Sequence, residues 1–221
     1  QDMPSFKKLF GTGNQLGMRF KYTIQAKPKG IPDAINVANK FIAQQPFVLA
    51  LADNLFIGNS FQKTLKQVQS IKSGAAVLAV KTKYPSKSAV IDLGKKGKIK
   101  SIIEKPKKPR SNLTIPGLYF YDSNSKTVVK KLKPSKRGEL EIVDVHLDYL
   151  EKQQLKVFSL KKDIKWFDTG DAEEMLEASN YVQTYQKNNK TLVGSIELFA
   201  LKHGWISKNK FKLMISKYSN S

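Results

Sequence analysis

The chain has 221 residues, 40% of them hydrophobic, which is enough for one domain with a sizeable core and argues against a disordered chain. Its formal net charge is +21, but lysine supplies nearly all of the positive charge, whereas readers of nucleic acid rely on the bidentate fork of arginine. We therefore expect no nucleic-acid partner, and a nucleic-acid-binding protein is the lowest-ranked alternative. Cysteine is absent, which excludes disulfides and thiolate metal sites and fits a reducing cytoplasm. No apolar run is long enough to cross a bilayer, so we expect no membrane partner.

Apolar periodicity predicts that strands and helices alternate along most of the chain. In chain order, the pattern predicts a helix over 4–10, a strand over 19–24, a helix over 31–42, a strand over 47–51, a helix over 61–71, a strand over 75–80, a hairpin of 89–93 with 98–103, a strand over 118–121, helices over 125–132 and 139–152, strands over 155–160 and 164–168, and a helix over 171–186.

This alternation predicts an α/β fold: a Rossmann-like, mixed and mostly parallel sheet with helices on both faces. We expect one domain over residues 1–221, in which residues 190–221 form a helical C-terminal tail. The two histidines, His146 and His203, stand apart in the sequence, and we expect them to occupy helix faces without a catalytic part.

Two aspartates end apolar runs that are far apart in the sequence. Asp53 follows the run from Phe47 to Ala52, and Asp168 follows the run from Ile164 to Phe167. In open α/β sheets the carboxyl ends of the strands form the edge at which ligands bind. Carboxylates from two strands can hold one Mg²⁺ and, through it, a phosphate. Each aspartate alone is also compatible with a simple cap on the helix or turn that follows.

Several motifs in a fixed order resemble those of the sugar-nucleotide nucleotidyltransferases. Each motif is weak alone, but their combination is specific and covers essentially the whole chain. They are Gln25–Gly30, Asp53, Ile103–Pro106, Pro116–Asp122, Ser135–Asp144 and Trp166–Gly170.

The resemblance implies a reaction and a setting for it. The expected reaction is transfer of the thymidylyl group of dTTP to glucose 1-phosphate, which gives dTDP-glucose and pyrophosphate for dTDP-rhamnose and cell-surface polysaccharide synthesis. Mg²⁺ is the expected cofactor, and a cytoplasmic homotetramer is the expected assembly. The alternatives are a uridylyl- or cytidylyltransferase of a hexose 1-phosphate and a non-catalytic subunit that binds a nucleotide or sugar phosphate.

The same resemblance implies roles for individual residues. Gln25 and Gly30 would contact the base, and Asp53 and Asp168 would hold the metal. In the sugar pocket, Glu104 would accept hydrogen bonds from glucose hydroxyls. The remaining expected positions are Lys105 and Arg137 as the catalytic residues that bind the sugar phosphate, and Gly117, Tyr119 and Trp166 as lining of the substrate site.

Other interpretations of these residues stay open. Glu104 to Pro106 is also compatible with an ordinary exit from a strand, and Arg137 with a surface position before a helix. Tyr119 and Trp166 are also compatible with plain core aromatics.

The family's first strand and its glycine-rich, triphosphate-binding loop have no counterpart in the given sequence. We therefore expect an N-terminally truncated copy that lacks the first βα unit. We further expect little or no turnover from residues 1–221 alone.

Overall fold

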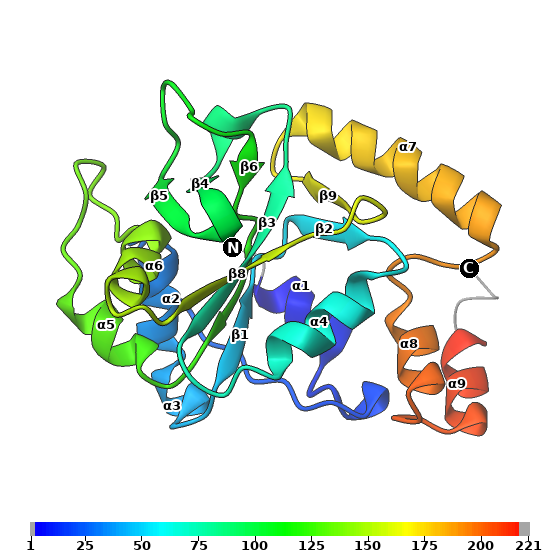
Figure 1. Cartoon of the computed structure of the whole chain (residues 1–221). Helices are drawn as coiled ribbons and strands as arrows, with labels where there is room; N and C mark the ends of the chain where they lie inside the picture. The colour runs from blue at the N-terminus through cyan, green and yellow to red at the C-terminus, as the bar shows by residue number, and fades with distance from the viewer. Residues whose placement is uncertain (1–2, 217–221) are drawn as a thin grey trace. The chain divides into compact units, whose positions relative to one another are not determined.

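The computed structural model describes residues 3–216, and the chain divides into two compact units. The larger unit runs from Gln25 to Tyr181 and holds every residue expected at the functional site. The smaller unit comprises the two ends of the described chain, up to Ile24 and from Val182 onward. Figure 1 shows the elements of both.

The smaller unit is helical. Its elements are α1 (Met3–Phe10), a 3₁₀ turn (Asn14–Leu16), the second half of α7 (Ala172–Asn189), α8 (Ile196–Lys202) and α9 (Lys208–Ile215). The side-chain oxygens of Ser195 and Ser207 accept hydrogen bonds from the first turns of α8 and α9, at Leu198 N and Lys210 N. Such serine caps explain why these two short helices begin where they do. Within the described part of the chain, α8 and α9 follow residue 190.

The larger unit contains a sheet, a two-stranded ladder and the remaining helices. Its helices are α2 (Ile31–Val37), α3 (Asn39–Ile42), α4 (Phe61–Gln69), α5 (Ser125–Lys131), α6 (Ile142–Glu151) and the first half of α7. Its strands are β1 (Phe47–Ala50), β2 (Asn54–Ile57), β3 (Ala75–Lys81), β4 (Val90–Leu93), β5 (Ile99–Ile103), β6 (Leu113–Thr114), β7 (Leu118–Tyr121), β8 (Leu155–Ser159) and β9 (Lys165–Asp168).

Seven strands form the sheet in the order β1-β7-β3-β6-β4-β5, with β8 also paired to β3. The remaining pair, β2 with β9, forms the separate antiparallel ladder. The expected mixed α/β fold with a central sheet is confirmed. Its pairing differs from the mostly parallel sheet we expected, because within residues 3–216 only β3 and β8 run parallel. The reason is that no α-helix lies between β3 and β7 in the chain, so β6 and β7 return beside β3, and β5 beside β4, without a crossover.

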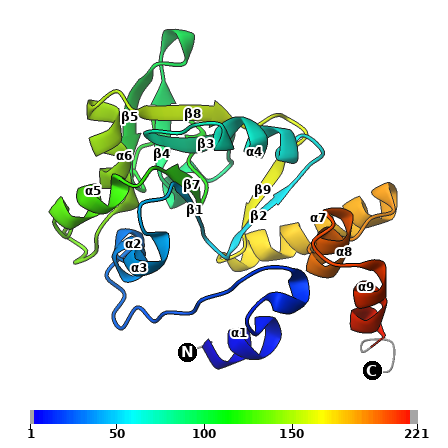
Figure 2. The same cartoon turned by 90° about the horizontal axis from the view of Figure 1, so that it is seen from below.

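Helices cover both faces of the sheet, as the sequence predicts (Figure 1 and Figure 2). Alternate residues of β3 point to opposite faces: Ala75, Val77 and Ala79 pack with α2, α5 and α6, whereas Ala76 and Leu78 pack with α4. These five side chains are at most 1% exposed. Because both faces are covered, β3 is apolar throughout its buried part rather than alternating.

Two sequence-based expectations for individual elements are corrected. Residues 19–24 form no strand, and Ile24 is 71% exposed. The alternation there is real, but a strand needs a neighbour, and none of the described strands pairs with it. The helix expected from Glu139 begins instead at Ile142, because Glu141 has an extended backbone (φ −92°, ψ 134°) and ends a loop.

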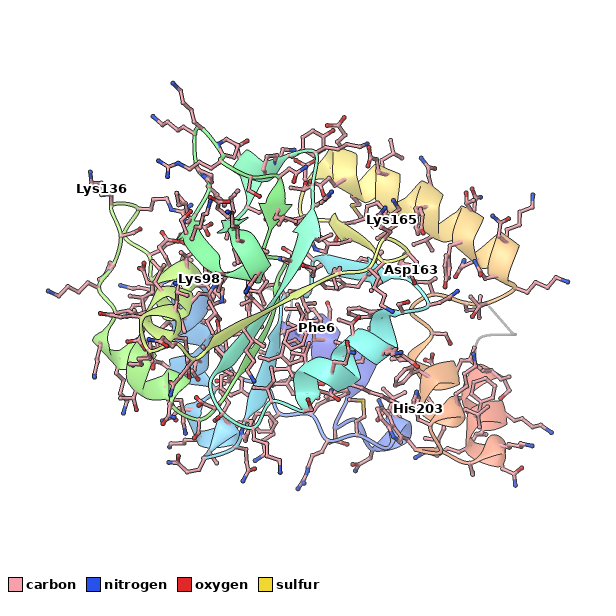
Figure 3. All side chains as sticks on the ribbon, viewed as in Figure 1. Phe6, Lys98, Lys136, Asp163, Lys165 and His203 are labelled. Carbon is pink, nitrogen blue, oxygen red and sulfur yellow. The ribbon has the colours of Figure 1, made fainter. Side chains whose placement is uncertain are left out.

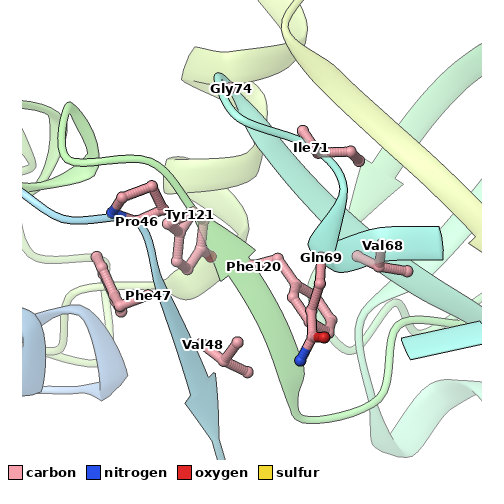
Figure 4. A pocket seen from close by; sticks show the side chains of 9 residues that line it. All are labelled: Pro46, Phe47, Val48, Val68, Gln69, Ile71, Gly74, Phe120 and Tyr121. Carbon is pink, nitrogen blue, oxygen red and sulfur yellow. The ribbon is translucent and has the colours of Figure 1, made fainter. Parts of the chain in front are cut away.

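A hollow of about 170 Å³ lies beside β1 at the end of the sheet (Figure 4). Its lining is mainly apolar and comes from β1, β7 and α4, with Phe47, Val48 and Phe120 among the contributing residues. None of the residues expected at the functional site lines it. The hollow therefore marks a free apolar edge of the sheet rather than a centre of polar chemistry.

Exposed lysines carry much of the positive charge of the larger unit. Lys98, Lys136 and Lys165 are exposed, and Figure 3 shows Lys136 on the loop between α5 and α6. In residues 3–216 no helix is long and apolar enough to cross a membrane.

One buried titratable group gives the core a pH dependence. His146 of α6 is 0% exposed, and its Nε2 lies 2.8 Å from the Tyr121 hydroxyl oxygen. In the described part of the chain its Nδ1 has no hydrogen-bond partner. Burial lowers the pKa of His146 from 6.5 to about 3.

We expect His146→Gln to flatten the acid dependence of stability. Below pH ~6.5 the unfolded chain takes up a proton that the folded chain refuses until about pH 3, so this group costs the wild type about 1.4 kcal/mol per pH unit in that window. Denaturant titrations at several pH values between 6 and 4 measure the slope, and glutamine does not titrate. The exposed His203, changed to Gln, is the matched control and should keep the wild-type slope. Equal slopes for wild type and His146→Gln would contradict the expectation.

Candidate functional site

The β2–β9 ladder brings the two aspartates together. Asn54, the first residue of β2, lies opposite Asp168, the last residue of β9. Asp53 immediately precedes that pair, and its carbonyl oxygen accepts hydrogen bonds from Thr169 N at 2.8 Å and Thr169 Oγ1 at 2.9 Å. The turn after β1 and the turn after β9 are therefore fixed to each other.

Gly170 shows how close the two carboxylates are. A Cβ atom added to Gly170 would lie 3.2 Å from Asp168 Oδ1 and 3.3 Å from Asp53 Oδ2, so both oxygens border one small space. The Gly170 N–H also donates to Asp168 Oδ1 at 3.2 Å. A side chain at this position would compete with any group held between the aspartates.

The donor set suits a hard divalent cation. Mg²⁺ is commonly bound in proteins by one or two carboxylates, with waters and substrate phosphate oxygens completing its shell. Asp53 and Asp168 supply such a pair. No group of three or more histidine, aspartate or glutamate side chains in residues 3–216 forms a closed metal cage. The chemistry of the pair thus fits an open site that is completed by a substrate.

Asn54 is the residue that the sequence analysis missed. Its Nδ2 donates to Asp53 Oδ1 at 2.7 Å, and its Oδ1 accepts from Gly117 N and from Trp166 Nε1, each at 2.7 Å. One amide therefore ties the metal-side carboxylate to two positions expected in the substrate site. The signal that the sequence offers for Asn54 is its place directly after Asp53.

A buried glutamate supports Asp168 from α7. Glu174 is 9% exposed, and its Oε2 accepts from the Asp168 backbone N at 3.1 Å. Asp171, just before α7, pairs with Lys87 at 2.7 Å. The end of β9 is thus held from the ladder on one side and from the first turn of α7 on the other.

Tyr119 lies within electrostatic reach of both aspartates and of Glu104. This β7 residue is 4% exposed. Burial raises the pKa of its hydroxyl, and the charges of Glu104, Asp53 and Asp168 raise it further. Tyr119 is therefore a neutral phenol, and the three carboxylates whose charges act on it come from separate parts of the chain.

Glu104 and Lys105 follow β5 directly. Burial raises the pKa of Glu104. The positive charges of Lys105 and Arg137 oppose that rise, and the negative charges of Glu141 and Asp144 add to it. Lys105 has a left-handed backbone (φ +41°), and its N–H donates to Ser88 O at 3.2 Å. This sharp turn is strained for a residue with a Cβ atom, and it lies where a strand ends at the candidate site.

Arg137 lies in the loop before α6 and is paired with Glu141. Its Nη2 lies 2.7 Å from Glu141 Oε2, and its Nε lies 3.1 Å from Glu141 Oε1. Ser135 Oγ donates to the same Oε1 at 2.7 Å. The pKa of Glu141 is lowered, mainly by the hydrogen bond from Arg137, so the pair stays ionised at neutral pH.

Gln25 and Gly30 lie beside that loop. Gln25 Nε2 donates to Gly30 O at 3.1 Å and to Asp33 Oδ2 at 2.9 Å. Gly30 has φ +93°, and a Cβ atom there would lie 2.1 Å from Leu140 O. Only glycine allows the two backbones to approach so closely at this angle.

The structure therefore places the expected residues in two linked groups. The first comprises Asp53, Asp168, Gly117, Tyr119 and Trp166. Hydrogen bonds of Asn54 connect Asp53, Gly117 and Trp166, and the charges of both aspartates act on Tyr119. The second comprises Glu104, Lys105, Arg137, Gln25 and Gly30, which gather around the loop 135–141. Glu104 belongs to both, because its charge acts on Tyr119. No direct hydrogen bond of the described residues joins Gln25 or Gly30 to the aspartates.

A sequence profile of the nucleotidyl transferase family matches residues 1–185. The chain belongs to this family. It is 39% identical over 212 residues to the glucose-1-phosphate thymidylyltransferase of Neisseria meningitidis serogroup A, a match that covers 96% of this chain and 74% of the relative. It is 37% identical over 205 residues to the enzyme of the same name from Mycobacterium tuberculosis, a match that covers 93% of this chain and 71% of the relative.

Solved structures of nucleotidyl transferases share the fold. A Bacillus anthracis protein assigned as a glucose-1-phosphate thymidylyltransferase, crystallised with a sucrose, superposes with a TM-score of 0.73 at 32% identity, covering 81% of this chain and 71% of that one. A UDP-glucose pyrophosphorylase complexed with UDP-glucose superposes with a TM-score of 0.67 at 28% identity, covering 76% of this chain and 67% of that one.

We expect Asn54→Ala to lower the free energy of unfolding by about 2–4 kcal/mol, because it removes three hydrogen bonds and leaves the Gly117 and Trp166 N–H groups without their acceptor. Urea titration followed by tryptophan fluorescence measures this loss. The exposed Asn112, changed to Ala, is the matched control and should cost less than about 0.5 kcal/mol. A similarly small loss for Asn54→Ala would show that the amide does not hold the site together.

Proposed function

We propose that the candidate site transfers the thymidylyl group of dTTP to glucose 1-phosphate, which gives dTDP-glucose and pyrophosphate. The observation that carries the proposal is the convergence of Asp53 and Asp168 on one small space, near enough to the buried Tyr119 for the charges of both aspartates and of Glu104 to act on it. A metal-binding carboxylate pair next to a carboxylate for sugar hydroxyls is what such a reaction needs. The names of the relatives support this choice of substrates.

The residues of this chain would bind and orient the two substrates. Lys105 and Arg137 would hold the phosphate of glucose 1-phosphate and reduce its negative charge as it approaches the α-phosphorus of the nucleotide. Glu104 would accept hydrogen bonds from the sugar hydroxyls, and the Gly117 backbone and Tyr119 would shape the pocket. No covalent bond to the protein is required, because the sugar phosphate oxygen attacks and pyrophosphate leaves in one displacement.

Asp53 and Asp168 would hold Mg²⁺. When bound there, Mg²⁺ would stabilise the negative charge that develops on the phosphate oxygens. The Gly170 N–H and the Glu174 carboxylate keep Asp168 in place for this purpose. Gln25 and Gly30 would contact the thymine base, the glutamine by its amide and the glycine by close approach of its backbone.

The proposed setting follows the family resemblance. dTDP-glucose would feed dTDP-rhamnose and cell-surface polysaccharide synthesis, and the working assembly would be a homotetramer. The absence of cysteine supports a cytoplasmic location.

Uridylyl transfer to the same sugar phosphate is the second candidate. The structural likeness to a UDP-glucose pyrophosphorylase complexed with UDP-glucose favours it. The two candidates share the metal and sugar residues and differ in the nucleoside: thymine has a methyl group that uracil lacks, and the ribose of UTP has a 2′-hydroxyl group that the deoxyribose of dTTP lacks.

Binding of the product separates these candidates. We expect chain 1–221 with Mg²⁺ to bind dTDP-glucose at least about tenfold more tightly than UDP-glucose, since a pocket built for a methyl group gains about 1–3 kcal/mol from filling it. Isothermal titration calorimetry measures both affinities, and a pyrophosphate-release assay with dTTP and glucose 1-phosphate, run in parallel, reports turnover.

Preference for UDP-glucose would replace the first candidate by the second. Failure to bind either sugar nucleotide would reject both. Tight binding without pyrophosphate release would identify a binding subunit, or a chain that needs further residues for turnover.

A further inference from the structure

We infer that Glu141 is a positioning residue for the sugar phosphate: it holds the Arg137 guanidinium by one edge so that the other edge faces the phosphate. This inference deepens the proposed function and rests on it.

The bonds between the two side chains occupy one edge of the guanidinium. Glu141 accepts one hydrogen bond from Arg137 Nε at 3.1 Å and one from Nη2 at 2.7 Å. A guanidinium has five N–H donors. Both protons of Nη1 and the second proton of Nη2 therefore remain, and among residues 3–216 no other side-chain hydrogen bond of Arg137 uses them. Two adjacent N–H groups on one edge match the geometry of a phosphate.

Glu141 is the anchored partner. Its side chain is 14% exposed, whereas that of Arg137 is 50% exposed. Glu141 directly precedes α6, and its Oε1 also accepts from Ser135 Oγ at 2.7 Å. The same serine oxygen accepts from the backbone N of Arg137 at 3.1 Å. Ser135 and Glu141 thus form a fixed base from which the exposed arginine extends.

The loop itself is closed at both ends. Ser135 N donates to Glu139 O at 2.8 Å, and Gly138 N donates to Ser135 O at 2.9 Å. On its other side, Leu140 N donates to Lys29 O at 2.9 Å, next to the close contact with Gly30. Because these bonds fix the backbone, Glu141 has a defined position before any ligand arrives.

Arg137 shares its electrostatic surroundings with Lys105 and Glu104. The charges of Lys105 and Arg137 both lower the pKa of Glu104, and Lys105 also lowers that of Glu141. The two cations Lys105 and Arg137 therefore share this corner of the site with Glu104, Glu141 and Asp144. Glu141 neutralises part of the positive charge that a phosphate would use, so a carboxylate here is a disadvantage for phosphate binding unless it orients the arginine.

The test replaces Glu141 by Gln and uses Glu139→Gln as its matched control. Both variants remove one negative charge from the same loop, but within the described residues no side-chain hydrogen bond or ion pair involves Glu139. The probes are glucose 1-phosphate and, as its phosphate-free counterpart, glucose. Isothermal titration calorimetry on chain 1–221 measures both affinities for the wild type and the two variants.

If Glu141 orients Arg137, we expect Glu141→Gln to weaken glucose 1-phosphate binding by about tenfold, which is the order of effect of a lost charge-assisted bidentate bond. Glu139→Gln should change it by less than about threefold, and glucose affinity should stay unchanged in all three proteins. In an Arg137→Ala background, Glu141→Gln should have no further effect, because the group that it positions is gone.

A second readout does not depend on the ligand. The chain has three arginines, Arg19, Arg110 and Arg137, so its side-chain Nε–H spectrum is simple to assign. The Nε–H signal of Arg137 should be protected from solvent exchange in the wild type and in Glu139→Gln, and lose that protection in Glu141→Gln.

Three outcomes would overturn the inference. Equal or tighter glucose 1-phosphate binding by Glu141→Gln would show that Glu141 acts only as a repelling charge, and the proposed function would still stand. An unchanged Arg137 signal in Glu141→Gln would show that the carboxylate does not hold the guanidinium. A wild type that does not bind glucose 1-phosphate at all would remove the proposed function and this inference together.

Discussion

The pairing of β2 with β9 is the interaction on which the candidate site depends. Two strands of four residues, more than a hundred residues apart in sequence, meet so that Asn54 faces Asp168 and Asp53 lies directly beside them. An apolar run that ends in an acidic residue is common. Two such runs can form a cation site only when their acidic residues lie next to each other in the fold. The Asn54 amide then makes the ladder part of the site, because it bonds to Asp53, to Gly117 and to Trp166.

The sheet and the loop before α6 supply the other half of this arrangement. β3 and β7 are buried on both faces, so Tyr119 has little freedom to move. Residues 136–138 of the loop are exposed, yet the contact of Gly30 with Leu140 and the bonds of Ser135 fix its backbone. A rigid core therefore positions Tyr119, and a hydrogen-bonded loop positions Arg137. This division suits a transfer that depends on positioning and charge stabilisation rather than on a protein nucleophile.

The sequence predicted most elements, because apolar runs report burial directly. It did not predict β2, because a four-residue strand after a turn has too short an apolar pattern. It also did not predict that most strands pair antiparallel, because burial does not indicate whether a neighbouring strand is parallel or antiparallel. The strand expected at residues 19–24 failed for the related reason that a pattern cannot supply a partner. The motifs identified ionisable residues at the candidate site. Asn54 and Glu141 act through hydrogen bonds to other residues, Asn54 to Gly117 and Trp166 and Glu141 to Arg137, and such bonds are seen only in the structure.

The central claim is that Asp53 and Asp168 hold one divalent cation together, and a Mn²⁺ titration tests it most directly. Electron paramagnetic resonance would measure Mn²⁺ affinity in the presence of dTDP-glucose for the wild type, Asp53→Asn, Asp168→Asn and the double variant. The account predicts that each single change weakens Mn²⁺ binding at least about tenfold and that the double change adds much less than the product of the two, because both remove ligands of the same ion. Wild-type affinity in either single variant, or two fully independent losses, would contradict it.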